Sequence, residues 1–108
     1  MSKKPGSPVR GSSTGKPLMV LLDVFGQRWT LRILWELRNG PLTFRQLQSA
    51  CGDISPTILN RRLKELRELN LLDHLGEGYG LSDWGRKMGR ELNAFEKLAV
   101  EWSSELTK

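Results

Sequence analysis

Cysteine and histidine are almost absent from this chain, which contains one of each, Cys51 and His74. One cysteine cannot form an intramolecular disulfide, and one Cys/His pair falls short of the ligands of a structural zinc site. Nothing near either residue marks it as an activated nucleophile or base. We therefore expect no catalytic site, no metal and no cofactor, although an enzyme that uses carboxylates alone is not excluded by this count. Cys51 is interpreted as a small buried residue and His74 as a surface or cross-strand residue.

Long apolar runs are also missing. The longest one spans residues 18–22, far short of the roughly 20 residues that cross a bilayer, so we expect no membrane segment. The basic N-terminal stretch continues into a Gly/Pro/Ser tract rather than an apolar core, which predicts no signal peptide and a cytoplasmic protein. A chain of 108 residues has room for one small domain with a single core.

The net charge of +5 is concentrated at one end of the chain. Residues 1–16 carry four basic side chains and no acidic one, whereas the remaining residues have 13 basic and 12 acidic side chains. These first 16 residues are too poor in apolar side chains to offset the entropy of ordering, so we predict a flexible basic tail before a domain at 17–108. Such a tail either stays solvated or follows a DNA phosphate backbone or minor groove.

Helix signals follow the tail. Pro17 suits the first turn of a helix that Gly26 ends. The segment "RWTLRILWELRNG" predicts a second helix, and a third runs over about 44–51 behind the capping-box pair Thr43 and Gln46. Apolar side chains cover nearly the whole circumference of the second helix, which predicts a central buried helix. They are Trp29, Leu31, Ile33, Leu34, Trp35 and Leu37.

Only the three residues "GDI" separate the third helix from the next start signal, Ser55 as N-cap with Pro56 at the first helical position. Two helices joined by a three-residue turn with glycine form the helix-turn-helix pattern. At 100° per residue, one stripe of the fourth helix is apolar and faces the core. This stripe consists of Leu59, Leu63 and Leu66.

The opposite face of the fourth helix carries Thr57, Asn60, Arg61 and Lys64, whereas Arg62 falls at the edge of the apolar stripe. This face is either a solvated surface or a DNA-reading one. We favour DNA reading, because the second helix of a helix-turn-helix presents its N-terminal half to the major groove. Arginine reads guanine, asparagine reads adenine and lysine pairs with phosphates. Arg62 would lay its stem on the core or touch a flanking phosphate.

The period changes after this helix. "LLDHL" and "YGLS" flank "GEG", which predicts a short β-hairpin, and Ser82 then caps a long helix to about Leu106. Apolar residues spaced 4, 3, 4, 3 and 4 apart form a heptad seam along a helix of about 36 Å. This seam packs either on its own domain or, as we favour, partly on a second copy of the chain. The seam consists of Met88, Leu92, Phe95, Ala99, Trp102 and Leu106.

The blocks "GQRWTLRILWEL", "GPLTFRQLQ", "GDISPTILNRRLKEL", "NLL" and "YGLSDWGRKM" resemble, in this order, the HxlR-type branch of bacterial MarR-like transcription regulators. The resemblance covers about 17–106. It implies a mostly α fold with a small β-hairpin (α+β), a winged helix-turn-helix with a long C-terminal dimerisation helix. It also implies a homodimer, joined by the first and last helices, on a pseudo-palindromic operator in double-stranded DNA.

With the recognition helix at 55–69, the predicted DNA-binding residues are Ser55, Pro56, Thr57, Asn60, Arg61, Arg62 and Lys64. The predicted dimer-interface residues are Leu18, Leu22, Met88, Leu92, Phe95, Ala99, Trp102 and Leu106.

Two departures from the family pattern matter. Lys16 stands where family members often carry a sensing cysteine, so thiol sensing by that route is unavailable. The short wing carries Asp73 and Glu77 and no arginine, so we expect the basic tail to replace its minor-groove contact. The alternatives are a winged-helix module that binds another protein and a nonspecific nucleic-acid-binding protein. The four tryptophans either line a pocket for an unidentified small-molecule effector or form an aromatic core.

Overall fold

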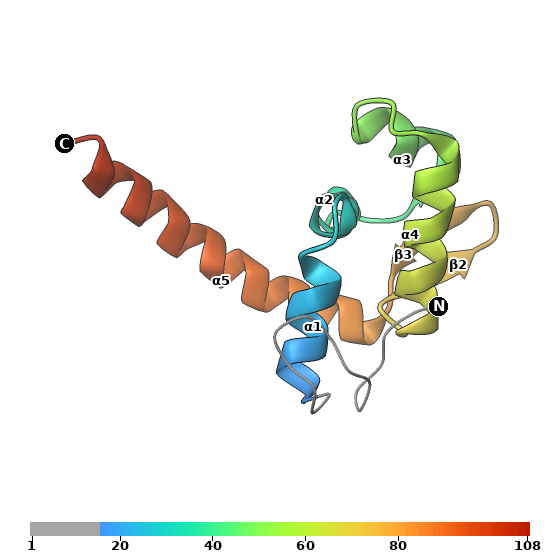
Figure 1. The fold of residues 1–108 in the computed structure, drawn as a ribbon. Coiled ribbons are helices and arrows are strands. Elements are labelled where there is room, and N and C mark those ends of the chain that lie inside the picture. The colour runs from blue at the N-terminus through green and yellow to red at the C-terminus, as the bar shows by residue number, and fades with distance from the viewer. Residues whose placement is uncertain (1–15) are drawn as a thin grey trace.

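The computed structural model describes residues 16–108, and the predicted basic tail lies almost entirely outside them. The described part has five helices and three strands in the order of a winged helix-turn-helix, which confirms the predicted fold (Figure 1). The elements are α1 (Pro17–Phe25), α2 (Thr30–Glu36), β1 (Leu42–Thr43), α3 (Phe44–Ala50), α4 (Pro56–Glu68), β2 (Leu72–Leu75), β3 (Gly78–Leu81) and α5 (Asp83–Leu106).

The helix starts form as the sequence predicts. The Thr43 hydroxyl accepts a hydrogen bond from the Gln46 backbone N–H at 3.1 Å, and the Gln46 side chain accepts one from the Thr43 N–H at 2.9 Å. The Ser82 hydroxyl accepts from the Gly85 N–H at 3.0 Å and donates to the Asn70 carbonyl oxygen at 2.6 Å. Each cap satisfies N–H groups that the first turn of a helix leaves without partners. Ser82 also fixes the start of α5 to the corner between α4 and β2.

One apolar core is built from helices α1, α2, α3 and α4 and from the corner that leads into β2. Helix α4 contributes an unbroken buried stripe, and α2 lies in the middle of the bundle. The buried cluster consists of Val20, Val24, Ile33, Leu34, Leu37, Leu47, Cys51, Ile54, Leu59, Leu63, Leu66, Leu71 and Leu72.

The sheet has one strand more than the predicted hairpin. Strand order is β1-β3-β2, with both pairs antiparallel, and Leu42 of β1 lies opposite Tyr79 of β3. A two-residue strand has no periodicity that a sequence could reveal, because it forms only through its partner. Gly78 makes this approach feasible, since a Cβ there would lie 3.0 Å from the Leu42 carbonyl oxygen.

Helix α2 is shorter and less buried than expected. It begins at Thr30, and Trp29 precedes it in a left-handed conformation with φ of 80°. Ile33 is fully buried, but Leu31 remains 39% exposed. The prediction that apolar side chains of α2 are buried all round is therefore wrong, because α1, α3 and α5 leave one side of α2 uncovered.

Helix α5 leaves the body of the domain after its first turns (Figure 1). Its root is tightly packed, because a Cβ on Gly85 would overlap the carbonyl oxygen of Leu71. Met88 still packs partly against the core, whereas every residue from Asn93 onward is exposed. The C-terminal half of α5 therefore projects as a single helix.

Candidate nucleic-acid interface

The turn between α3 and α4 is held by the backbone. Gly52 and Asp53 both adopt positive φ, 69° and 61°, which reverses the chain within three residues. The Asp53 N–H donates to the Gln48 carbonyl oxygen at 2.9 Å, and the Gln48 side chain donates to the Ile54 carbonyl oxygen at 3.0 Å. Ile54 is buried in the core beneath the turn. These contacts fix the angle at which α3 presents α4.

Helix α4 divides cleanly into two faces. Its apolar stripe is buried, as predicted, and Ser55 caps it through the Ile58 N–H at 3.5 Å. Six of the seven residues predicted to contact DNA are exposed at the helix start or on the face away from the core, and among the described residues neither Arg61 nor Lys64 has an acidic partner. These six are Ser55, Pro56, Thr57, Asn60, Arg61 and Lys64.

Arg62, the seventh, is held by protein contacts. Its side chain is only 16% exposed and forms an ion pair with Glu65 at 3.2 Å. Its Nε donates to the carbonyl oxygen of Arg28, 34 residues away, at 2.9 Å. That carbonyl immediately precedes Trp29, so Arg62 joins α4 to the turn between α1 and α2. Of the two positions the sequence allowed for Arg62, the structure shows the one against the core.

Two further exposed basic side chains, which the sequence analysis did not single out, lie on α4 and α3. Arg67 is exposed one turn beyond Lys64, and Arg45 is exposed on α3. The helical wheel already contained the signal for Arg67, which lies at about 80° when Leu59 is at zero, beside Asn60.

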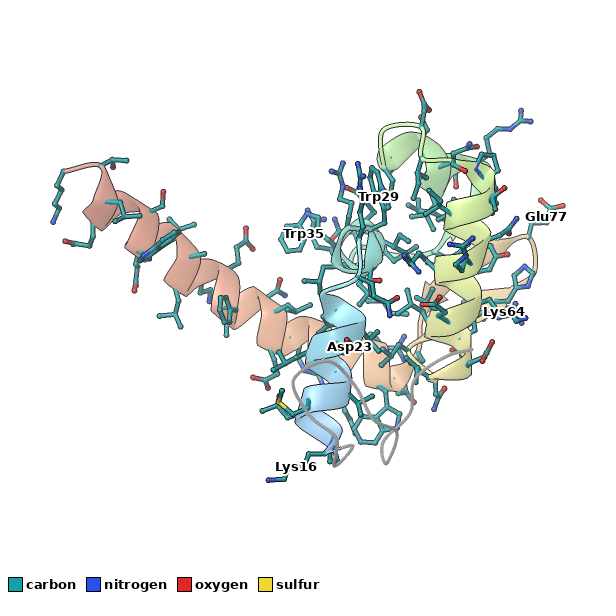
Figure 2. The ribbon with its side chains drawn as sticks, in the orientation of Figure 1. Lys16, Asp23, Trp29, Trp35, Lys64 and Glu77 are labelled. Carbon is teal, nitrogen blue, oxygen red and sulfur yellow. The ribbon has the colours of Figure 1, made fainter. Side chains whose placement is uncertain are left out.

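The hairpin forms a short acidic wing. Asp73 and Glu77 are exposed, and Glu77 lies at the tip of the hairpin (Figure 2). His74 stacks on Tyr79 across the two strands, with ring centroids 4.4 Å apart and planes within 3°. The prediction that His74 is a cross-strand surface residue is confirmed.

A second surface is apolar. Among the residues predicted at a dimer interface, Leu18 and Leu22 of α1 and Phe95, Trp102 and Leu106 of α5 are all more than half exposed. Met88 and Leu92 are partly buried near the root of α5, and Ala99 is exposed. The sequence analysis missed Trp84 and Leu98, which are 52% and 61% exposed and lie on the same side of α5 by their helical angles.

Cys51 is buried, as predicted. Burial raises the pKa of its thiol, an effect that the nearby Arg32 opposes and Glu36 reinforces, so the thiol stays protonated and shielded. Within residues 16–108, no group of three or more metal-ligating side chains comes together. No helix in this part of the chain is long and apolar enough to span a bilayer.

A helix-turn-helix whose second helix exposes a polar, basic face, followed by a β-hairpin and a projecting helix, defines a winged-helix DNA-binding protein. Residues 24–107 match the model of the HxlR-like helix-turn-helix family, and the chain belongs to this family. It is therefore a helix-turn-helix transcriptional regulator, which is not an enzyme class.

Relatives in two bacteria support this assignment. The HTH-type transcriptional regulator YvaP of Bacillus subtilis (strain 168) is 31% identical over 88 residues, covering 75% of this chain and 82% of that protein. The regulator MT3179 of Mycobacterium tuberculosis is 34% identical over 102 residues, covering 88% of this chain and 59% of that protein.

Solved structures of YodB from B. subtilis have the same fold. The quinone-bound form gives a TM-score of 0.73 at 24% identity, covering 78% of this chain and 96% of that one. The reduced form gives 0.65 at 26% identity, covering 73% and 84%.

Proposed function

We propose that this regulator binds a pseudo-palindromic operator as a homodimer, with α4 in the major groove and the exposed side chains of Asn60 and Arg61 reading bases. The observation that carries the proposal is that α4 has one buried apolar face and one exposed polar face. Its apolar stripe is completely used inside the domain, while its N-terminal half presents amide, hydroxyl and basic groups with no acid before Glu65. Asparagine can donate to and accept from an adenine edge, arginine can donate twice to a guanine edge, and Lys64 suits a phosphate.

The apolar surface of α1 and α5 supports the homodimer. Large apolar side chains that remain more than half exposed along a projecting helix mark a protein contact rather than a solvated surface. Their heptad spacing is that of a helix that packs against another helix. In a twofold dimer the same patch of each chain meets its counterpart, so one surface per chain is sufficient. Two copies would then carry two recognition helices, which accounts for an operator with two half-sites.

The test is selection of duplexes from a randomised pool by the purified protein at near-physiological salt, followed by sequencing. We expect enrichment of an inverted repeat with half-sites about one helical turn, or 34–36 Å, apart. Arg61→Ala, run in parallel, should lose the preference at one position of each half-site. Retention of all DNA alike would favour a nonspecific nucleic-acid-binding protein. Failure to retain DNA by a folded, dimeric protein would favour a winged-helix module that binds another protein.

The side chains do not support thiol-based sensing. One structural relative is described as quinone-bound. In this chain the only thiol, Cys51, is buried with a raised pKa, and Lys16 occupies the position where the family often has a cysteine. We therefore propose no covalent quinone chemistry for this regulator.

A further inference from the structure

An apolar pocket of about 320 Å³ lies where α1, the corner between α4 and β2, and the first turns of α5 meet (Figure 1). It is partly open to solvent, and the described residues that line it include no charged side chain. Helix α1 and the root of α5 supply most of its apolar walls. These walls include Val20, Leu21, Val24, Trp84 and Met88.

The pocket and the proposed dimer surface use different sides of α1. At 100° per residue, the three α1 side chains that line the pocket are centred roughly 130° away from Leu18 and Leu22. A second copy that packs on Leu18 and Leu22 therefore leaves the pocket side of α1 uncovered. The pocket is thus a separate feature of the chain and not part of the surface proposed to join two copies.

Trp84 forms the aromatic wall of the pocket. It lies at the root of α5 and remains 52% exposed. The ammonium group of Lys87 lies over its ring, 4.4 Å from the centroid, which leaves the other face of the indole for the pocket. The next residue, Gly85, packs against the carbonyl oxygen of Leu71, so the backbone that carries Trp84 is fixed. A half-exposed indole held beside a concave apolar surface is typical of a ligand site.

The size and polarity of the pocket define the chemical class of its ligand. An apolar cavity of about 150 Å³ can bind benzene, so a pocket of roughly twice that volume has room for two fused rings. A charged molecule would lose its hydration and gain no opposite charge from these walls. At the corner, the side-chain amide of Asn70 makes no hydrogen bond within residues 16–108 and can pair with one polar group of the ligand.

We propose that this pocket binds a small neutral molecule with two fused aromatic rings and one hydrogen-bonding group, and that this molecule is an effector of the regulator. The effector role rests on the proposed function. The pocket connects the C-terminal end of α4 to α1 and α5, the helices that carry the proposed dimer surface. A ligand there contacts the elements whose relative orientation sets the distance between two recognition helices. Operator and ligand then change each other's affinity by the same factor.

The first test measures binding by the full-length protein without DNA at pH 7.5. The probe is indole, which is neutral, has two fused rings and carries one N–H donor. Indole-3-carboxylate, the same ring with a charge, is the matched control. We expect indole to bind with a dissociation constant of about 10 µM to 1 mM and the carboxylate to bind at least about tenfold more weakly. Methyl NMR locates the probe, because signals of Leu21 and Met88 should shift and those of Leu75 should not.

Variants assign the binding to named side chains. Trp84→Ala removes the aromatic wall and should weaken indole binding about tenfold or more. Leu75→Ala is the matched control, because Leu75 is 51% exposed on the hairpin and should leave binding unchanged. Asn70→Gly removes the amide but keeps the left-handed backbone, whose φ is 59°, and should weaken binding about threefold to tenfold. Thermal melting checks that each variant folds.

The second test measures coupling to DNA. Saturating indole should change the affinity of the wild type for its selected operator at least about threefold, and bound operator should change the affinity for indole by the same factor. At the same indole concentration, Trp84→Ala should show a much smaller change in operator affinity. Leu75→Ala should respond like the wild type.

The possible failures are distinguishable. The ligand site is overturned if the folded protein does not bind indole, if the carboxylate binds equally well, or if the NMR shifts lie outside the pocket. It is also overturned if indole binds only to Phe95→Asp, which carries a charge on the proposed dimer seam, because a second copy then covers the pocket. Binding in the pocket with no change in operator affinity overturns the effector role and leaves the proposed function standing. If the protein without indole discriminates no operator, the proposed function and the effector role fail, and the first test still decides the ligand site.

Discussion

Helices α4 and α5 are both amphipathic, yet they use their apolar stripes in opposite ways. In α4 the three stripe leucines are at most 2% exposed, whereas in α5 Phe95, Trp102 and Leu106 are 65% to 68% exposed. The stripe of α4 is satisfied within the chain, so only its polar face is available to a partner. The stripe of α5 is not satisfied within the chain, so its apolar face is the available one. The same sequence period thus builds the core in one helix and leaves an exposed apolar face on the other.

The largest effect is expected inside the α4 stripe. Leu63→Ala removes a side chain that is 2% exposed and leaves a cavity, which should cost about 2–5 kcal/mol of unfolding free energy. Urea unfolding followed by circular dichroism measures it. Val100→Ala on α5 is the matched control, because Val100 is 62% exposed and off the seam, and we expect a change within about 0.5 kcal/mol. Equal losses of unfolding free energy in the two variants would contradict the difference in burial between α4 and α5.

The second prediction concerns the exposed apolar stripe of α5, where a charged side chain replaces an apolar one. Phe95→Asp should leave the folding of the monomer nearly unchanged but cost about 3 kcal/mol in dimer association, because it removes a phenyl group and introduces a carboxylate at the interface. That loss is more than a hundredfold in the dissociation constant, which sedimentation equilibrium can measure. Val100→Asp places the same charge on the other side of α5 and should dimerise normally. A fully dimeric Phe95→Asp would remove the proposed interface.

The junction between α5 and the body of the domain depends on Gly85. A Cβ there would overlap a backbone oxygen, that of Leu71, so Gly85→Ala should force the root of α5 outward and cost about 1–3 kcal/mol. Gly89→Ala is the control one turn later. Nothing lies within 4 Å of a Cβ at Gly89, so alanine should be neutral or stabilising by up to about 1 kcal/mol. Thermal unfolding of both variants distinguishes a packing requirement from helix propensity.

The neighbouring arginines of α4, Arg61 on its polar face and Arg62 against the core, should behave differently. Arg61→Ala is expected to lose about 1–3 kcal/mol on the operator and to relax base preference, with unchanged stability. Arg62→Ala should instead lower the unfolding free energy, because the Arg28 carbonyl and Glu65 lose their partner, and should retain base preference. Binding to the operator and to a scrambled duplex, together with urea unfolding, checks both. An identical pattern in the two variants would contradict the assignment.

The smallest effect concerns Cys51, which lies at the C-cap of α3. Burial raises the pKa of its thiol in the folded chain, so the folded state keeps this proton at a pH where the unfolded chain releases it. The protonated Cys51 thiol therefore contributes to stability fully below the ordinary thiol pKa. This contribution is lost as the pH rises toward the raised pKa of the folded chain. The difference in unfolding free energy between the wild type and Cys51→Ala should therefore narrow between pH 7 and pH 10. A constant difference would contradict the pKa direction.

Local signals made α4 predictable. Ser55, Pro56 and the 3.6-residue period of its leucines lie within one short segment, and they specify the start of the helix, its buried stripe and its exposed face. The contact from Arg62 to the Arg28 carbonyl was not predictable, because it joins positions 34 residues apart whose proximity depends on how α1 and α2 pack. Sequence pattern assigned Arg62 to the edge of the core but could not identify its partner.

Other features depend on tertiary contacts in the same way. The pairing of Leu42 with Tyr79 makes β1 a strand, and the left-handed Trp29 follows from the turn that brings α2 against α1. The heptad period of α5 was visible in the sequence. The length of the helix also favoured a seam that its own domain covers only in part. Which turns the domain covers was not visible, because a period says which side is apolar and not what covers it.

The most direct measurement is the number of chains bound to the selected operator, determined by sedimentation velocity for the wild type and for Phe95→Asp. If α4 reads bases and α5 joins copies, the wild type forms a complex of two chains on one inverted repeat. Phe95→Asp should then bind the half-sites independently and more weakly. A single wild-type chain bound with full affinity, or a Phe95→Asp protein that still binds cooperatively as a pair, would contradict this division of roles between the two helices.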